Sequence, residues 1–237
     1  MEITIANLYP DLLNLYGDAG NISTLKRRLE LRGIDVTVKE YSINDEIDLE
    51  NTDILFIGGG SDKEQRTVAG RLCEIKDSLK AYRDKGKVIL AVCGGFEVIC
   101  NSYKLGKEVI KGAGILDINC DYSKERLTGN VILESDLTGS TIVGFENHNG
   151  RITQNKYPPL GKVIYGNGSD GSKTNEGVAD NNTFATYLHG PLLPKNPMLA
   201  DYILEKALEK KYGKTELAAL DDEFEEKAHQ YILDTYK

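Results

Sequence analysis

The chain lacks the features that mark several large classes of protein. It has 29 Lys and Arg residues against 37 Asp and Glu residues, a formal net charge of −8, which argues against a nucleic acid or an anionic membrane surface as the main partner. No apolar run approaches the ~20 residues of a membrane span, and the first residues lack the basic segment of a secretory signal. We therefore expect a cytoplasmic protein that is not an integral membrane protein.

Cysteine and histidine are also scarce. The cysteines are Cys73, Cys93, Cys100 and Cys120. They lack the CxxC spacing of a zinc site or redox pair, so we expect free thiols in a reducing compartment and no metal in this chain. The histidines are His148, His189 and His229. Any mechanism that pairs a cysteine with a histidine base therefore has few candidates.

Apolar β-type runs alternate with helical patterns through the first half of the chain. The predicted strands cover residues 3–8, 35–41, 53–57 and 87–92, and the helical patterns cover residues 21–31, 63–83 and a start at 96–99. Repeated strand–helix units predict an α/β fold with a mainly parallel, flavodoxin-like sheet and helices on both faces.

The second half has a different pattern. Short β-type runs at residues 115–119, 130–134, 141–145 and 162–165 are separated by Gly, Asn, Asp and Pro, which predicts antiparallel strands or an excursion at one edge of the sheet. A late strand covers residues 183–188. The chain is predicted helical from about residue 196, ending in an acidic amphipathic helix over residues 216–236 that is either solvated or a docking surface. We expect residues 1–237 to form a single domain.

One cysteine stands at a strand-to-helix turn. The apolar strand that ends at Val92 runs into Cys93, Gly94 and Gly95, and a helix start follows. This is the pattern of a nucleophile elbow, in which small neighbours permit a tight turn and the helix N-terminus favours the reactive thiolate. The alternative is a buried cysteine in a glycine turn.

Two further strand ends carry polar or glycine-rich segments. The strand before Gly58, Gly59 and Gly60 ends in a glycine loop, so the N–H groups of Gly60 and Gly94 are candidate oxyanion donors. A phosphate-binding loop is the alternative, but the Lys-Ser/Thr of a P-loop is missing.

A histidine follows the last predicted strand, in Tyr187–Leu188–His189–Gly190–Pro191. His189 is a candidate base for the thiol and acid for departing ammonia, or else a hydrogen-bonded structural histidine. His229, in the acidic C-terminal helix, is interpreted as structural. His148, in a predicted polar turn, is a second candidate for the base.

These segments together resemble the class I glutamine amidotransferases, and most of all the branch of the cobyric acid and cobyrinate amidases. In the branches with a catalytic triad, Glu stands two positions after the histidine, whereas this chain has Pro191, which fits the Cys–His dyad of that branch. The segment GFENHNG also resembles the corresponding segment of that branch.

The elbow helix of the class usually carries Gln four positions after the nucleophile. Here it is Glu97, which cannot donate as an amide does, so its contact with glutamine is in doubt and its side chain is free to face elsewhere.

Three longer segments, LYPDLLNLYGDAGN, ERLTGN and YLHGPLLPKNP, resemble the GatD family, the small glutaminase subunits of lipid II isoglutaminyl synthase. The resemblance implies that Cys93 and His189 are catalytic and that Arg126 holds the glutamine substrate. A guanidinium is suited to this, since it pairs bidentately with an α-carboxylate. Considered without the family, Arg126 is only a charged residue at a predicted strand start.

The resemblance also implies a reaction and a partner. Glutamine would be hydrolysed through a Cys93 thioester without a cofactor in this chain. Its ammonia would pass, within a heterodimer, to a MurT-like synthetase of Mur-ligase type that uses ATP and Mg²⁺. That partner would amidate the α-carboxyl of D-glutamate in lipid II, for peptidoglycan synthesis, cell wall biogenesis and cell shape. The alternatives are an amidotransferase subunit for another acceptor such as a corrinoid, a Cys-dependent hydrolase or deglycase of flavodoxin-like fold, and a non-catalytic regulatory module.

Overall fold

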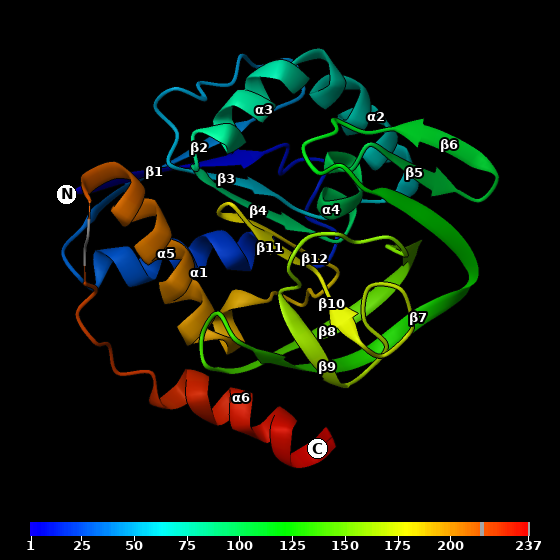
Figure 1. The fold of residues 1–237 in the computed structure, drawn as a ribbon. Helices are drawn as coiled ribbons and strands as arrows, with labels where there is room; N and C mark the ends of the chain where they lie inside the picture. Colours follow the sequence, from blue (N-terminus) through cyan, green and yellow to red (C-terminus); the bar gives the residue numbers. More distant parts are fainter. Residues whose placement is uncertain (214–215, 237) are drawn as a thin grey trace.

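A six-stranded sheet forms the centre of the molecule (Figure 1). The computed structural model describes residues 1–213 and 216–236. The strands run in the spatial order β11–β12–β4–β3–β1–β2, and every neighbouring pair is parallel except β11 with β12. Their bounds are β1 (Glu2–Leu8), β2 (Asp35–Tyr41), β3 (Ile54–Ile57), β4 (Val88–Val92), β11 (Val178–Asp180) and β12 (Thr183–Thr186). The predicted mainly parallel sheet is confirmed, with one antiparallel edge strand.

Helices cover both faces of this sheet, as expected (Figure 1). On one face lie α1 (Ala19–Glu30) and α5 (Pro197–Tyr212), and on the other lie α2 (Asp62–Glu74), α3 (Lys76–Asp84) and α4 (Gly94–Ile99). All residues of β3 and β4 are buried, which explains why these strands are continuous apolar runs instead of alternating ones.

The helical stretch predicted over residues 63–83 is confirmed, but it consists of two helices that meet at Ile75. Ile75 leaves the helical region, with φ −108° and ψ 17°. The break turns the chain so that Leu72 of α2 and Leu79 of α3 are both buried in the core. Apolar spacing predicts the helices but not this bend between them.

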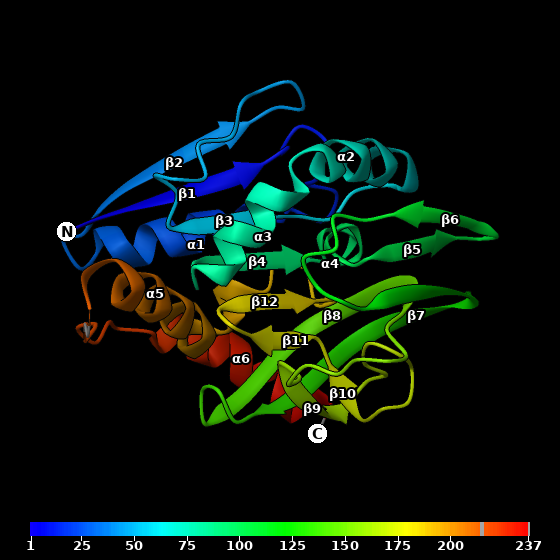
Figure 2. The same cartoon turned by 45° about the horizontal axis from the view of Figure 1, so that its top comes forward.

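The middle of the chain forms a second sheet beside the first (Figure 2). Its strands are β5 (Ser102–Leu105), β6 (Glu108–Lys111), β7 (Asn119–Ser135), β8 (Ser140–Arg151), β9 (Gly161–Tyr165) and β10 (Asn175–Glu176). The strands run in the order β10–β9–β7–β5–β6, and β8 pairs with β7. The antiparallel pairs β7–β8 and β7–β9 are as predicted. They do not extend the edge of the parallel sheet, however, and most of the run expected at 115–119 precedes β7.

The long β7–β8 ribbon was predicted as two short strands because its outer half is polar. The two strands are paired from Asp121 opposite Arg151 to Ser135 opposite Ser140, apart from a register shift between Tyr122 and Leu127. That shift is a bulge, and bulges redirect side chains. It places Arg126, one of the intervening residues, in the wall of the same cavity as Cys93, at the carboxyl edge of the parallel sheet.

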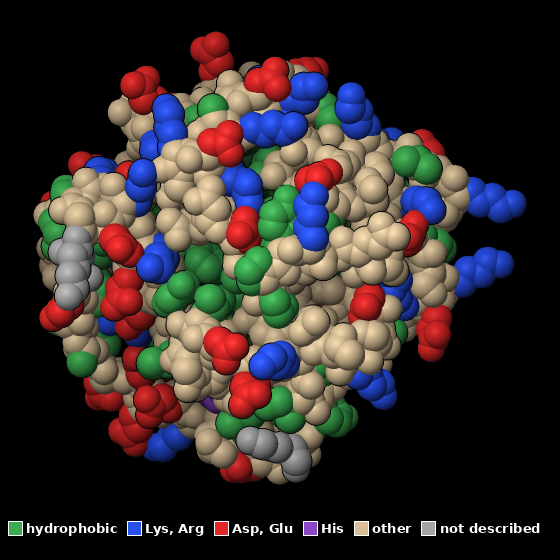
Figure 3. Space-filling model, in the orientation of Figure 1, with side chains coloured by type: hydrophobic (Ala, Val, Ile, Leu, Met, Phe, Trp, Pro, Cys, Tyr) green, Lys and Arg blue, Asp and Glu red, His purple; other side chains and the backbone are tan. Residues whose placement is uncertain are grey.

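The C-terminal helix α6 (Glu223–Tyr236) lies against β8 and the short helix η1 (Leu193–Lys195) (Figure 1). The predicted start at residue 216 is wrong, since residues 216–222 are not helical. The helical tail predicted from about residue 196 also includes 214 and 215, which lie outside the described ranges. Acidic side chains gather over the start of α6 (Figure 3), and no residue of α6 is buried.

Polar contacts hold α6 and the segment before it. Arg28 of α1 donates to Asp201 of α5 (Nε–Oδ1 2.6 Å) and to Asp222 (Nη1–Oδ1 2.5 Å). His229 contacts Thr141 (2.7 Å) and the carbonyl of Lys195 (2.7 Å). Within the described ranges, no helix is long and apolar enough to cross a membrane.

Candidate active site

Cys93 occupies the strand-to-helix turn that the sequence predicts. Its backbone has φ 53° and ψ −110°, its N–H donates to the Thr186 carbonyl (2.8 Å), and α4 begins at Gly94. Gly95 packs so closely against the backbone of Ile57 that a Cβ added there would lie 2.2 Å from the Ile57 carbonyl oxygen. The turn therefore needs glycine at this position. The thiol therefore stands at the carboxyl edge of the parallel sheet, where open α/β sheets bind their ligands.

His189 comes to the same edge from the neighbouring strand. β12 pairs with β4 in parallel, with Thr186 opposite Val92, so the residues after each strand are neighbours. A two-way backbone bridge to Phe145 of β8 then fixes the chain at His189 (N–H to O 3.0 Å, and 3.2 Å in return). The sheet register thus brings together the two residues that were singled out separately in the sequence.

The imidazole of His189 is buried between aromatic rings. The Tyr16 ring stacks on it with centroids 4.1 Å apart and 21° between the planes, and Phe145 approaches edge-on at 6.2 Å. Burial, followed by the charges of His148 and Arg126, lowers the pKa of His189 to about 4. The ring is thus neutral near pH 7, and its Nε2 has no hydrogen-bond partner among the described residues. It is chemically able to accept a proton.

The thiol of Cys93 is protonated at rest. Burial raises its pKa above the ordinary range, and the charges of Glu97 and Asp18 raise it further, while the Gly94 N–H and Arg126 oppose the shift. The structure has no hydrogen bond between the Cys93 sulfur and His189, and such contacts often tighten only when substrate binds. A thiol with a raised pKa would need a general base to become a nucleophile, and the neutral imidazole at the end of the neighbouring strand is the candidate.

The glycine loop after β3 lies against the nucleophile. A Cβ added at Gly59 would lie 3.2 Å from the Cys93 Cβ. The Gly59 N–H is already taken by the buried carboxylate of Asp18 (2.8 Å), which leaves the next residue, Gly60, as the candidate oxyanion donor of this loop. Burial raises the pKa of Asp18 to about 6. Sequence reasoning missed Asp18, whose only local signal is its place in the segment GDAGN.

A cavity of about 510 Å³ opens beside Cys93. It is lined from both sheets and from the loop after β1, by residues that include Tyr16, Gly60, Gln65, Cys93, Glu97, Arg126, Asn147, His148 and Asn149. His189 is not among its lining residues, but Tyr16, which stacks on His189, is. The volume suits an amino-acid-sized ligand.

Arg126 faces this cavity from the bulge of β7, inside the strand and not at its start as expected. Its guanidinium donates to the Asn149 side chain (2.7 Å), the Asn147 carbonyl (3.1 Å) and the Asn147 side-chain oxygen. Two asparagines of β8 thus aim the guanidinium at the cavity that contains Cys93. Sequence reasoning found Arg126 only through the family resemblance and did not find the asparagines.

Glu97 faces the same cavity. Its Oε1 accepts from the Tyr187 hydroxyl (3.1 Å), and the Cys120 thiol lies 3.6 Å away. Burial raises the pKa of Glu97 to about 7, against the opposing effects of Tyr187, His148 and Cys120. The sequence left open whether the Glu97 side chain faces away from Cys93. In the structure it lines the same cavity, one helical turn further along α4.

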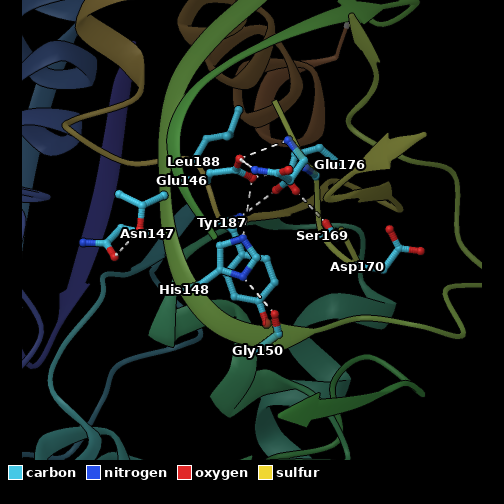
Figure 4. Close-up of polar contacts among 12 residues, drawn as sticks. Glu146, Asn147, His148, Gly150, Ser169, Asp170, Glu176, Tyr187 and Leu188 are labelled. Carbon is cyan, nitrogen blue, oxygen red and sulfur yellow. Dashed lines mark hydrogen bonds and ion pairs between the residues drawn. The ribbon is translucent and has the colours of Figure 1, made fainter. Parts of the chain in front are cut away.

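His148 belongs to strand β8 and not to the polar turn predicted for it. Its ring lies flat on Tyr187, with centroids 3.7 Å apart, and its Nδ1–H donates to the Gly150 carbonyl (2.8 Å) (Figure 4). Behind it, the buried carboxylate of Glu176 accepts from the Thr186 side chain (2.8 Å) and the Tyr187 N–H (2.7 Å). His148 thus supports the cavity wall, whereas His229 lies on α6 against Thr141.

Residues 4–197 match the family model for the CobB/CobQ-like glutamine amidotransferase domain. The chain is 43% identical to the lipid II isoglutaminyl synthase subunit GatD of Staphylococcus aureus (strain N315), over 98% of this chain and 96% of that protein. It is 39% identical to the GatD of Streptococcus pneumoniae (strain ATCC BAA-255 / R6), over 93% and 86%. Cobyric acid synthase of Clostridium perfringens (strain SM101 / Type A) is 28% identical over 60% of this chain and 30% of that protein.

Two solved structures share the fold at low sequence identity. A crystal structure of a glutamine amidotransferase superposes with a TM-score of 0.58 at 17% identity, over 85% of this chain and 98% of the other. The glutaminase domain of Trypanosoma brucei CTPS with bound acivicin gives a TM-score of 0.54 at 13% identity, over 90% and 98%. At these identities the likeness concerns the fold alone.

Proposed function

Because the chain belongs to the CobB/CobQ-like glutamine amidotransferase family, we propose that it is the glutaminase subunit of a lipid II isoglutaminyl synthase. The GatD relatives that carry this name match nearly the whole chain, which supports the choice of pathway. The observation that carries the chemistry is the elbow, which presents Cys93 one strand away from the buried, neutral His189.

The proposed reaction begins at the side-chain amide of L-glutamine. His189 takes the thiol proton as the Cys93 sulfur attacks the amide carbon, and the C–N bond breaks as His189 returns that proton to the departing ammonia. Water then attacks the γ-glutamyl thioester, which restores the thiol and releases L-glutamate. One glutamine and one water give one glutamate and one ammonia, with no oxidant and no cofactor.

Two sets of donors stabilise and orient the substrate in this proposal. Gly94 follows Cys93 in the chain and Gly60 lines the same cavity, and their N–H groups would stabilise the oxyanion of the tetrahedral intermediates. Arg126, aimed by its asparagines at the same cavity, pairs with the α-carboxylate of glutamine. The cavity thus holds the two ends of one amino acid, with the amide at Cys93 and the carboxylate at Arg126.

We further propose that the ammonia is used by a separate synthetase subunit. Forming an amide from a carboxylate and ammonia requires an activated carboxyl, and this chain carries no P-loop pattern that would bind a nucleotide. The partner proposed is a MurT-like protein of Mur-ligase type that uses ATP and Mg²⁺ to activate the α-carboxyl of D-glutamate in lipid II. This chain would meet lipid II only through that partner.

The chemistry and the pathway are tested separately. 6-Diazo-5-oxonorleucine, a reactive glutamine analogue, should label the wild-type chain at Cys93 and leave Cys93→Ala unlabelled, as read by peptide mass spectrometry. Absence of labelling in the folded wild type would refute the glutaminase. With the partner present, amide-¹⁵N glutamine should transfer ¹⁵N to D-glutamate in lipid II. Transfer to a corrinoid acceptor instead would keep the chemistry and refute the pathway.

A further inference from the structure

Tyr16 stands between the base and the cavity. It lies in the loop that joins β1 to α1, its ring covers His189, and it lines the cavity beside Cys93, whereas His189 does not. His189 is only 1% exposed. The face of the imidazole toward this loop is therefore shielded by one side chain from a part of the chain remote in sequence.

The hydroxyl of the same tyrosine contacts the cationic end of the cavity. Asn147 Nδ2 donates to it (3.0 Å), and Arg126 Nη2 lies 3.5 Å from it. A tyrosine hydroxyl has two acceptor positions and one proton. With both acceptor positions facing Asn147 and Arg126, its own O–H is left to donate to a ligand, and a carboxylate bound to Arg126 is an acceptor placed within reach.

We propose that Tyr16 is a positioning residue that couples glutamine binding to the base, through its ring on His189 and its hydroxyl beside Arg126. This inference rests on the proposed glutaminase function, because it assumes that His189 is the base and that Arg126 binds the substrate carboxylate. Tyr16 adds a direct physical link between the proposed base and the residue proposed to bind the substrate carboxylate.

The ring has a chemical task as well as a steric one. When His189 accepts the thiol proton it becomes a cation, and the charged groups that face it, Arg126 from β7 and His148 from β8, disfavour that cation. The Asn147 carbonyl and the π face of Tyr16 are the groups that favour it. Tyr16 also covers one face of the ring and so contributes to the burial that is the main reason the His189 pKa is low. Removing the ring should therefore change the protonation of His189 and not only the stability of the loop.

Two substitutions separate the two contacts. Tyr16→Phe keeps the ring and removes the hydroxyl, so we expect the KM for glutamine to rise by about tenfold or more, as for one hydrogen bond to a charged group, with kcat and the acid limb of the pH profile unchanged. Tyr16→Ala exposes the imidazole, so we expect kcat to fall and the acid limb of kcat/KM to move up from near pH 4 toward pH 6.5. Tyr231→Phe and Tyr231→Ala, on the exposed face of α6, are the matched controls and should change neither parameter.

Labelling of Cys93 by 6-diazo-5-oxonorleucine shows that each variant retains a folded site. If labelled Tyr16→Ala has wild-type or higher kcat and an unmoved acid limb, Tyr16 does not position the base, and the inference is overturned. An unchanged KM in labelled Tyr16→Phe would remove the link to Arg126. If the wild type itself is not labelled, the glutaminase function fails, and this inference fails with it.

Discussion

The parallel sheet and the second sheet meet at the Cys93 cavity but hold their residues there by different means. Cys93 is fixed by its backbone, through the β4–β12 register and the turn into α4. Arg126, on the β7 bulge, is instead held by side-chain and carbonyl contacts to Asn147 and Asn149. In the proposed mechanism, the strand ends of the parallel sheet place the reacting groups, while the paired strands β7 and β8 hold the substrate. Substitutions at the strand ends of the parallel sheet should therefore change mainly kcat, and substitutions on β7 and β8 should change mainly the KM for glutamine.

The largest effect is expected at Cys93. Cys93→Ser preserves the volume of the turn but replaces the sulfur nucleophile, and we expect glutamine hydrolysis to fall by at least about 10³-fold. The measurement is ammonia release by the folded variant. Cys73→Ala, on α2 with its thiol near the Gly112 carbonyl (3.2 Å), is the control and should hydrolyse glutamine normally. Retention of more than a few per cent of the rate by Cys93→Ser would sink the nucleophile assignment.

The second largest effect is expected from the loss of His189, compared with the loss of His229. His189→Ala removes the proposed base and should lower kcat by about 10²–10⁴-fold, whereas His229→Ala removes only contacts of α6 to Thr141 and Lys195. Both rates are measured at saturating glutamine, with folding checked by near-ultraviolet circular dichroism. Equal losses in two folded variants would mean that the parallel sheet does not supply the base.

Substitution of Arg126 tests whether the second sheet binds glutamine. Arg126→Ala removes a charge-assisted contact, so we expect the KM for glutamine to rise about 10–100-fold, with a smaller change in kcat. Arg66→Ala, which breaks an exposed ion pair to Glu108 (2.6 Å), is the matched control and should be near neutral. A glutamine titration that gives the same KM for Arg126→Ala and the wild type would show that the ribbon does not hold the substrate.

The smallest effect, and the one most specific to this chain, concerns Glu97. Its pKa of about 7 means that a carboxylate accumulates beside Cys93 as the pH rises through 7, and that charge opposes the thiolate. Glu97→Gln keeps the acceptor for Tyr187 without the charge. We expect equal rates below pH 6 and a variant faster by up to about tenfold above pH 8. A constant ratio of the two rates from pH 6 to 9 would contradict this account.

Stability gives an independent reading of the same group. The folded-state pKa of Glu97 is raised from 4.5 to about 7, so the unfolded chain loses this proton first as the pH rises. The wild type should therefore lose stability relative to Glu97→Gln between about pH 4.5 and 7. Urea unfolding of both proteins at pH 5 and pH 8 should show a gap that widens toward pH 8.

The parallel half could be predicted because its signals are local. A buried apolar strand, a glycine turn and a helix start lie within a dozen residues around Cys93, and the same holds for the strand before Gly58. The late strand ahead of His189 completes the edge, since parallel neighbours end on the same side of a sheet. The polar ribbon has no such local signal, because the pairing of β7 with β8 is what makes it a strand.

The supporting residues of the site could not be predicted for a related reason. Tyr16 reaches His189 across more than 170 positions of sequence, and His148 is buried only because it lies on Tyr187. Neither residue type signals such a contact from its own neighbours. Glu97 was noticed as a departure from the class, but whether its carboxyl faces the thiol depends on how α4 lies against β8 and Tyr187.

The backbone of Cys93 has a consequence for how this protein can change over time. A non-glycine residue at φ 53° and ψ −110° is held in a sparsely populated conformation that costs about 1–3 kcal/mol, and glycine would occupy the same turn with less strain. Under the proposed function, it is the need for a sulfur nucleophile that keeps a side chain at this position. In a lineage that no longer needs ammonia from glutamine, drift should favour glycine at position 93. A relative with glycine there could therefore be recognised as one that has kept the architecture and abandoned the chemistry.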